Sequence, residues 1–319
     1  MAYRKIIFSF LFISISAWAQ VRYIDYPSPF HSTIGTSGMV VSQNQDSSEI
    51  GVEILNMGGN AIDAAVAVGL SLAITLPRAG NLGGGGFMLI YLSDEKRTIA
   101  VDFRSAAPGN LTEKDFLFLK NNYDQRRYGY KASAVPGTVA GLLEAHKRYG
   151  KLSLKTIMQP VISQAKEGMH ISYDLNQAIG SADQIKLDDE SKSIYYKNDV
   201  PQRKHALVKR SDLAWTFNEI ANNGQEAFYS GSISKKIVKA MKQNNGYISA
   251  EDLKNYKPRF SEPIHTTYRN YKIFAHPPPA GGAAVLLEGL NIIENFETND
   301  LGPNSADFIH IFAEALQRG

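Results

Sequence analysis

The segment from Ala61 to Leu76 constrains the fold most, because it reads AIDAAVAVGLSLAITL and carries a single charge, Asp63. A helix that is apolar on nearly all faces belongs inside a protein, packed between other layers. Asn60, with Asp63 three residues later, predicts the start of this helix, and Pro77 predicts its end. A chain of 319 residues with 44% hydrophobic content can build a core that encloses it.

The elements next to this helix are also predictable. A short strand is expected in SGMVV, followed by a helix that starts with Asp46 and Glu49 and stops at Gly58. After the helix come four glycines, 83–86, and then two apolar runs, 87–92 and 98–104, separated by a polar turn. Those runs predict a β-hairpin.

The rest of the chain predicts more helices and one more hairpin. Pro136 and Gly150 bound one helix, and another ends at Gly168 despite Pro160 in its interior. Two strands are expected to meet at Arg269 and Asn270, ahead of three prolines at 277–279. Further helical patterns cover 211–222, 232–243, one turn capped by Ser249 with Asp252, about 282–295, and 304–318. No repeat or linker marks a boundary, so residues 20–319 are predicted to form one domain.

The first 19 residues are predicted to be a secretory signal peptide. Arg4 and Lys5 precede an apolar stretch from Ile6 to Ala17, and Ala17 and Ala19 give a small-x-small cleavage pattern. A membrane anchor is the alternative, but the stretch is shorter than the roughly 18 residues that a spanning helix needs. No later segment is apolar enough to span a bilayer. We therefore expect a periplasmic or secreted protein, and the absence of cysteine means that no disulfide supports it.

Charge and motif content exclude several classes of function. The 34 basic and 31 acidic residues are interspersed, which argues against nucleic acid as a partner. His31, His146, His170, His265, His276 and His310 lack metal-ligand spacing and are expected to be surface or packing residues, so we predict no metal and no cofactor. The G-x-S-x-G pattern of an α/β-hydrolase nucleophile is also absent.

The glycine run does not match a phosphate-binding loop. Such loops run from a strand into a helix, whereas here a helix precedes the glycines and a strand follows them. Met88 and Gly86 also stand where the two common templates need glycine and lysine. A tight structural crossing between layers is the favoured interpretation, and direct ligand contact is the alternative.

Arg104, in AVDFRSAAP, is the candidate binding residue. Strand alternation predicts that Asp102 and Arg104 share one face, close to the end of the strand. A guanidinium there could bind both oxygens of a carboxylate. On these residues alone, an ordinary ion pair or a solvated strand end is the preferred interpretation.

Several motifs together resemble one family, the γ-glutamyltranspeptidases (γ-glutamyltransferases, glutathione hydrolases). They are GNAIDAAVAVGLSLAITLPRAGNLGGGGFMLIY, VDFRSAAP, VPGTVAGLLEAHKRYG, GYISAEDLKNYKP and YRNYKIFAHPPPAGG, in the family's order and approximate spacing. The resemblance extends from about Gly38 to Gly319. It implies an α+β fold, the αββα sandwich of N-terminal-nucleophile hydrolases, incomplete in this chain.

The resemblance also implies a function. Family members cut themselves before a threonine, which then attacks the γ-glutamyl amide of glutathione or other γ-glutamyl compounds and passes the acyl group to water, an amino acid or a dipeptide. Arg104 matches the arginine that binds the α-carboxylate of the γ-glutamyl group, which replaces the ion-pair interpretation. The partner implied is the small subunit from the same precursor.

Two departures and the end of the sequence qualify this picture. Ser105 stands where the family usually has glutamate, and Ala280 to Ala283 replace the usual two serines and two glycines. We expect the catalytic threonine beyond Gly319, so no catalytic residue is assigned here, and the chain alone is expected to be inactive. The alternatives are a related N-terminal-nucleophile amidase, similar to a β-lactam acylase, and a catalytically silent exported protein.

Overall fold

The computed structural model describes residues 33–319. Residues 39–319 form one compact unit, and the described part of the other unit, residues 33–38, contains neither helix nor strand. The predicted signal peptide, residues 1–19, lies outside the described residues.

Among residues 33–319, no helix combines the length and the apolar character that crossing a membrane requires.

The predicted buried helix is α2 (Ala61–Thr75), and it pairs with α1 (Gln45–Asn56). Asn60 and Asp63 form the expected capping box, and most of α2 is buried. Two details of the prediction were wrong. The N-cap of α1 is Asn44, whose side chain accepts the N–H of Ser47, so Asp46 lies inside the first turn. No strand forms at 37–41, because this segment has no neighbouring strand among the described residues with which to pair.

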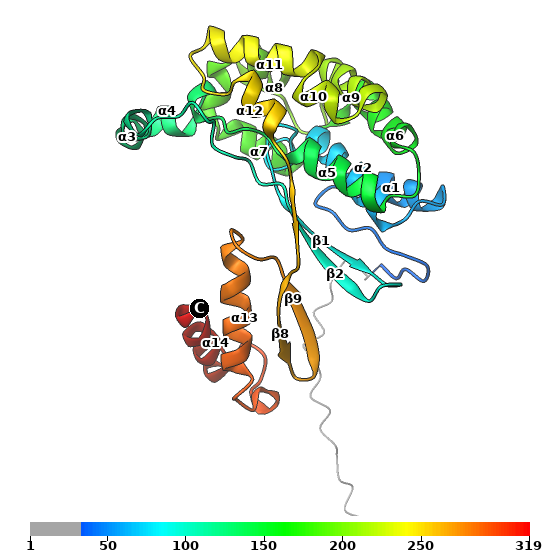
Figure 1. Ribbon diagram of the computed structural model, residues 1–319, viewed down its shortest axis with the longest axis vertical. Coiled ribbons are helices and arrows are strands. Elements are labelled where there is room, and N and C mark those ends of the chain that lie inside the picture. The colour runs from blue at the N-terminus through cyan, green and yellow to red at the C-terminus, as the bar shows by residue number, and fades with distance from the viewer. Residues whose placement is uncertain (1–32) are drawn as a thin grey trace, which may run out of the picture. The chain divides into compact units, whose positions relative to one another are not determined.

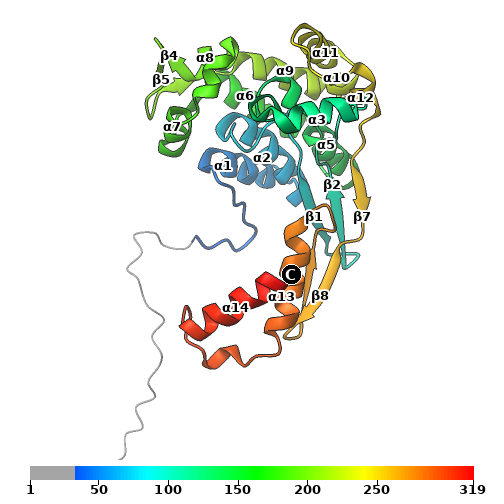
Figure 2. The ribbon, with the colours of Figure 1, turned by 90° about the vertical axis from the view of Figure 1, so that its left-hand side faces the viewer.

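The first hairpin forms as predicted. Strands β1 (Phe87–Leu92) and β2 (Arg97–Asp102) pair antiparallel, with Phe87 opposite Asp102. A third strand that the sequence did not reveal, β7 (Arg259–Ser261), pairs with the other edge of β2, which gives the order β1-β2-β7 (Figure 2). The middle strand is buried from Thr98 to Asp102, whereas β1, which follows the glycine run, is buried only at Ile90.

Helices α1, α5 (Thr138–Tyr149) and α6 (Leu154–Glu167) pack on α2, and α5 also contacts β2, so that helices supply most of the core (Figure 1). The predicted ones are α5, α6, α9 (Ser211–Asn223), α11 (Ser232–Gln243) and α12 (Ala250–Asn255). Those that the sequence did not reveal are α3 (Glu113–Asn121), α4 (Tyr123–Arg127), α7 (Tyr173–Gly180), α8 (Asp189–Tyr195) and α10 (Gln225–Tyr229). The minor elements are the 3-10 turns η1 (Tyr130–Ala132), η2 (Asp183–Leu187) and η3 (Thr298–Asp300), and the two-residue strands β3 (Met169–His170), β4 (Tyr196–Lys197), β5 (Val200–Pro201) and β6 (Leu207–Val208).

The C-terminal part is a second hairpin followed by two helices. Strands β8 (Ile264–Tyr268) and β9 (Tyr271–Ala275) pair through a turn in which Arg269 and Asn270 both have positive φ. Helices α13 (Gly281–Ile293) and α14 (Ala306–Arg318) pack on each other, and α13 contacts both strands. The chain is therefore an α+β structure, as predicted.

Candidate carboxylate-binding site

The four glycines form a close crossing of backbone, which confirms the favoured interpretation. The carbonyl of Gly84 accepts the N–H groups of Gly137 (2.8 Å) and Thr138 (3.1 Å) at the start of α5. Gly86 and Phe103 exchange both backbone hydrogen bonds, at 3.0 and 3.3 Å. A Cβ at Gly85 would lie 2.4 Å from the amide nitrogen of Ser105, which leaves no room for a side chain. The N–H groups of Gly137 and Thr138 therefore bind the glycine run itself and are not directed at a phosphate.

Arg104 lies just beyond the strand rather than within it. Strand β2 ends at Asp102, and the carboxylate of Asp102 is almost completely buried. One of its oxygens accepts the backbone N–H of Arg104 at 2.9 Å, and the other pairs with Arg259 of β7 at 2.5 Å. Asp102 thus holds the backbone of Arg104. The prediction that the two side chains share a face stays a prediction.

A tyrosine fixes the other side of the Arg104 peptide group. The hydroxyl of Tyr256, just after α12, donates to the carbonyl oxygen of Arg104 at 2.8 Å. Its ring stacks on Tyr229, with centroids 5.9 Å apart and planes 11° apart. The Tyr229 hydroxyl donates to the carbonyl of Pro136 (2.9 Å) and accepts the N–H of Ala140 (3.1 Å). Burial raises the pKa of Tyr256 to about 12 and raises that of Tyr229 as well, so both hydroxyls remain donors at neutral pH.

The guanidinium of Arg104 is held near an aromatic face and keeps its charge uncompensated. Arg104 is exposed, and its guanidinium carbon lies 5.9 Å from the ring centroid of Phe87. The other neighbour of Phe87 is the ring of His276, 4.4 Å away between centroids. Within residues 33–319, no carboxylate pairs with Arg104. A fixed backbone with a free guanidinium is the arrangement that a carboxylate-binding site needs.

The two departures from the family pattern lie at different places. Ser105 follows Arg104 directly and is exposed. Ala280 is the N-cap of α13, and its N–H donates to the carbonyl of Pro277 at 3.3 Å. At Gly281 and Gly282 a Cβ would meet nothing within 4 Å, so the start of α13 is open.

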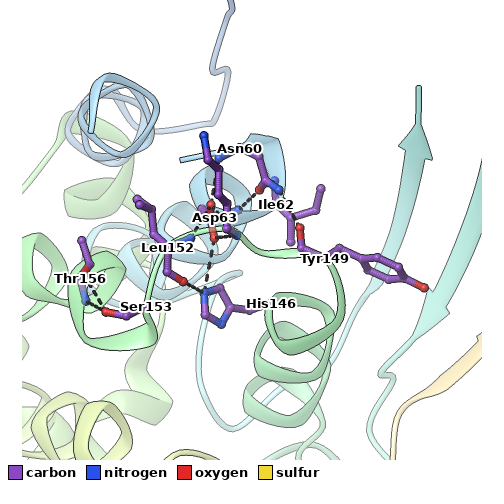
Figure 3. A network of polar contacts seen from close by, with 9 residues as sticks. Asn60, Ile62, Asp63, His146, Tyr149, Leu152, Ser153 and Thr156 are labelled. Carbon is purple, nitrogen blue, oxygen red and sulfur yellow. Dashed lines mark hydrogen bonds and ion pairs between the residues drawn. The ribbon is translucent and has the colours of Figure 1, made fainter. Parts of the chain in front are cut away.

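A second polar cluster, which the sequence analysis noticed only as a helix cap, connects α2 to the turn between α5 and α6 (Figure 3). Asp63 is fully buried and accepts the backbone N–H groups of Asn60 (2.9 Å), Lys151 (3.0 Å) and Leu152 (3.2 Å). Nε2 of His146 lies 3.0 Å from the carbonyl oxygen of Leu152 and 3.4 Å from Asp63. This cluster is structural, which agrees with the expectation that His146 is a packing residue.

In the part of the chain that the structure describes, no three His, Cys, Asp or Glu side chains are grouped so that they could hold a metal ion.

Comparisons with known proteins agree on one family. The family model for Gamma-glutamyltranspeptidase matches residues 47–319. The "Glutathione hydrolase proenzyme" of Escherichia coli (strain K12) is 40% identical over 290 residues, which are 90% of this chain and 50% of that protein. The chain thus spans about half the length of the curated relatives it matches.

Solved structures give the same result. A crystal structure of Helicobacter pylori gamma-glutamyltranspeptidase matches with a TM-score of 0.85 and 37% identity, over 90% of this chain and 83% of that chain. A cephalosporin acylase from Bacillus halodurans matches with a TM-score of 0.82 and 28% identity, over 92% of this chain and 56% of that one. The family model over residues 47–319 and these matches establish that the chain belongs to the γ-glutamyltranspeptidase family.

Proposed function

We propose that the complete protein hydrolyses or transfers the γ-glutamyl group of glutathione and related γ-glutamyl compounds, and that Arg104 binds the α-carboxylate of that group. The observation that carries the proposal is the free guanidinium of Arg104 on a backbone held at both ends, by Asp102 and by Tyr256. Membership of the family and the likeness to glutathione hydrolases support it.

In this proposal the described residues supply binding and orientation, and no nucleophile is assigned to them. The family resemblance assigns the nucleophile to a threonine of the complete protein, freed by self-cleavage that also separates the small subunit. Its hydroxyl oxygen bonds to the γ-carbonyl carbon, the C–N bond breaks, and the departing amine takes a proton. Water, an amino acid or a dipeptide then accepts the glutamyl group from the resulting ester.

Arg104 contributes to this reaction through geometry. Binding the far end of the glutamyl group fixes the distance from the α-carboxylate to the reacting carbonyl, and such positioning accounts for a large part of the barrier reduction in enzymes. We further propose that the first 19 residues direct the protein to the periplasm or the medium, since they combine a basic start, an apolar stretch and a cleavage pattern.

A second candidate function is amide hydrolysis of the β-lactam acylase type. The likeness to the cephalosporin acylase favours it, and Ser105 and Ala280 to Ala283 show that this chain departs from the usual transpeptidase pattern near Arg104 and at α13. Such an enzyme need not recognise an α-ammonium group, whereas a γ-glutamyl enzyme must.

One comparison of substrates separates the two functions. The complete gene product is assayed with γ-glutamyl-para-nitroanilide and with glutaryl-para-nitroanilide, which keeps the carboxylate and lacks the α-ammonium group. We expect a higher kcat/KM for the γ-glutamyl compound. A preference for the glutaryl compound would favour the acylase, and no turnover of either would contradict both candidates and favour the silent exported protein.

A further inference from the structure

A largely apolar cavity of about 490 Å³ lies among α2, α7, α8 and the first turn of α9. This volume is within the range of small-molecule sites. The apolar residues in its wall include Leu82, Leu175, Ile179, Ile194 and Leu213. Arg104, Phe87 and Tyr256 do not line it, so the cavity is distinct from the candidate carboxylate-binding site.

Arg210 brings a positive charge into this apolar wall with little compensation. Its side chain is only 14% exposed, and its ion-pair partner, the half-exposed carboxylate of Asp212, is 3.5 Å away. Its Nη1 donates to the hydroxyl of Tyr195 at a long 3.3 Å. Its Nε is buried and has no hydrogen-bond acceptor among the described residues. A buried, weakly paired guanidinium is expensive, since each buried ion loses several kcal/mol of hydration.

The other groups of the cavity do not neutralise Arg210. Burial is the main cause of a raised pKa at Tyr195, so this phenol stays neutral and supplies no negative charge. The second cation of the wall, Arg78, has a partner of its own in Asp174, at 2.6 Å. Arg210 is thus the cation of this wall that is largely buried and whose ion-pair partner, Asp212, is half-exposed and 3.5 Å away.

We propose that this cavity binds a small carboxylate with an apolar body. The carboxylate pairs with the guanidinium of Arg210, which presents a fork that suits two oxygens, and the apolar body fills the space against Leu82, Ile179 and Leu213. Binding adds a second anion beside a guanidinium that Asp212 pairs only at 3.5 Å, and it covers the apolar wall in the same event. A cationic solute would lack the negative charge, and a strongly polar anion would lack the apolar body.

The test uses phenylpropionate and its neutral isostere phenylpropionamide as probes, with the complete gene product and ligand-observed NMR. We expect phenylpropionate to bind about tenfold or more tightly than the amide, as hydrogen bonds to a charged group predict. Arg210→Gln should remove that preference. Arg104→Gln should leave it intact, because Arg104 belongs to the other site.

A second pair of variants keeps the result decisive if Arg210→Gln does not fold. Ala178 lines the cavity on α7, so Ala178→Phe should fill the space and abolish binding. Gln177→Phe is the matched control, because Gln177 is the exposed neighbour outside the wall.

Equal binding of acid and amide to the wild type, a preference for the acid that survives in folded Arg210→Gln, or binding that survives in Ala178→Phe would overturn the proposal. Loss of binding in Arg104→Gln alone would place the probe at Arg104, which would overturn the cavity site and leave the proposed function standing.

Discussion

Asp63 and Arg104 are two charged side chains with opposite environments. Asp63 is fully buried, and its carboxylate accepts hydrogen bonds from the backbone N–H groups of Asn60, Lys151 and Leu152 (Figure 3). Arg104 is exposed, and its backbone is held while its guanidinium pairs with no carboxylate of residues 33–319. A buried carboxylate that accepts hydrogen bonds from the backbone stabilises the fold. An exposed guanidinium without an ion-pair partner, on a fixed backbone, is available to bind a ligand.

The largest expected effect is the loss of stability when the buried carboxylate of Asp63 is removed. Asp63→Ala removes a fully buried carboxylate and leaves three backbone N–H groups without their acceptor, so we expect the free energy of unfolding to fall by about 4 kcal/mol. Urea denaturation measures it. The control is Asp46→Ala, an exposed position in α1, which should change stability by less than about 0.5 kcal/mol. Equal small effects would show that the Asp63 cluster does not hold the fold.

The next effect concerns the crossing that holds Arg104. A Cβ at Gly137 would lie 2.0 Å from the carbonyl oxygen of Phe103 and 2.1 Å from the Tyr256 hydroxyl. Gly137→Ala should therefore destabilise by about 2 to 3 kcal/mol through overpacking. Gly281→Ala, where a Cβ meets nothing within 4 Å, should be neutral or stabilise by about 0.5 kcal/mol. Thermal unfolding compares them, and an unchanged Gly137→Ala would contradict the tight crossing.

A smaller effect is expected from the hydroxyl that holds the Arg104 carbonyl. Tyr256→Phe removes one hydrogen bond, worth about 1 kcal/mol, and should raise KM for a γ-glutamyl anilide more than it lowers kcat. Tyr91→Phe, at an exposed tyrosine of β1, is the control and should change neither quantity. A fall in kcat with KM unchanged would mean that Tyr256 acts elsewhere than through Arg104.

The same tyrosine predicts an alkaline limit of stability. Burial raises its pKa from the ordinary 10.0 to about 12, so the folded state holds the proton more tightly than the unfolded state. Stability should therefore fall as pH rises from about 10 towards 12, where the unfolded phenol ionises first. Urea denaturation at several pH values measures this, and the free energy of unfolding should fall less steeply with pH in Tyr256→Phe than in Tyr91→Phe. Identical slopes would contradict the burial of Tyr256.

The smallest effect is expected at the free charge. Arg104→Ala breaks no ion pair of the described residues, so its unfolding free energy should change by less than about 0.5 kcal/mol. Urea denaturation of Arg104→Ala and Asp63→Ala under the same conditions compares the two losses of unfolding free energy. A large loss of stability would show that Arg104 stabilises the fold, as Asp63 does, and would contradict the contrast between the two residues.

Local signals predicted much of the fold. Apolar content revealed α2, capping residues marked α2 and α12, and the pair Arg269 and Asn270 marked the turn between β8 and β9. Elements that depend on distant partners were missed, above all β7, whose three residues form a strand only because β2 lies beside them. The same holds for the site. Arg104 stood out by its place near a strand end, but the sequence could not show that Tyr256, 152 positions away, holds its carbonyl.

The most direct test of the central claim measures kcat/KM for wild type and Arg104→Ala of the complete gene product on two substrates. One is γ-glutamyl-para-nitroanilide, and the other is γ-aminobutyryl-para-nitroanilide, which lacks only the α-carboxylate. Losing the pairing should lower kcat/KM on the first substrate by about 100-fold, as the loss of hydrogen bonds between charged groups predicts. On the second substrate, the variant and the wild type should be equally slow. Equal losses on both substrates, or none on the first, would contradict a carboxylate-binding role for Arg104.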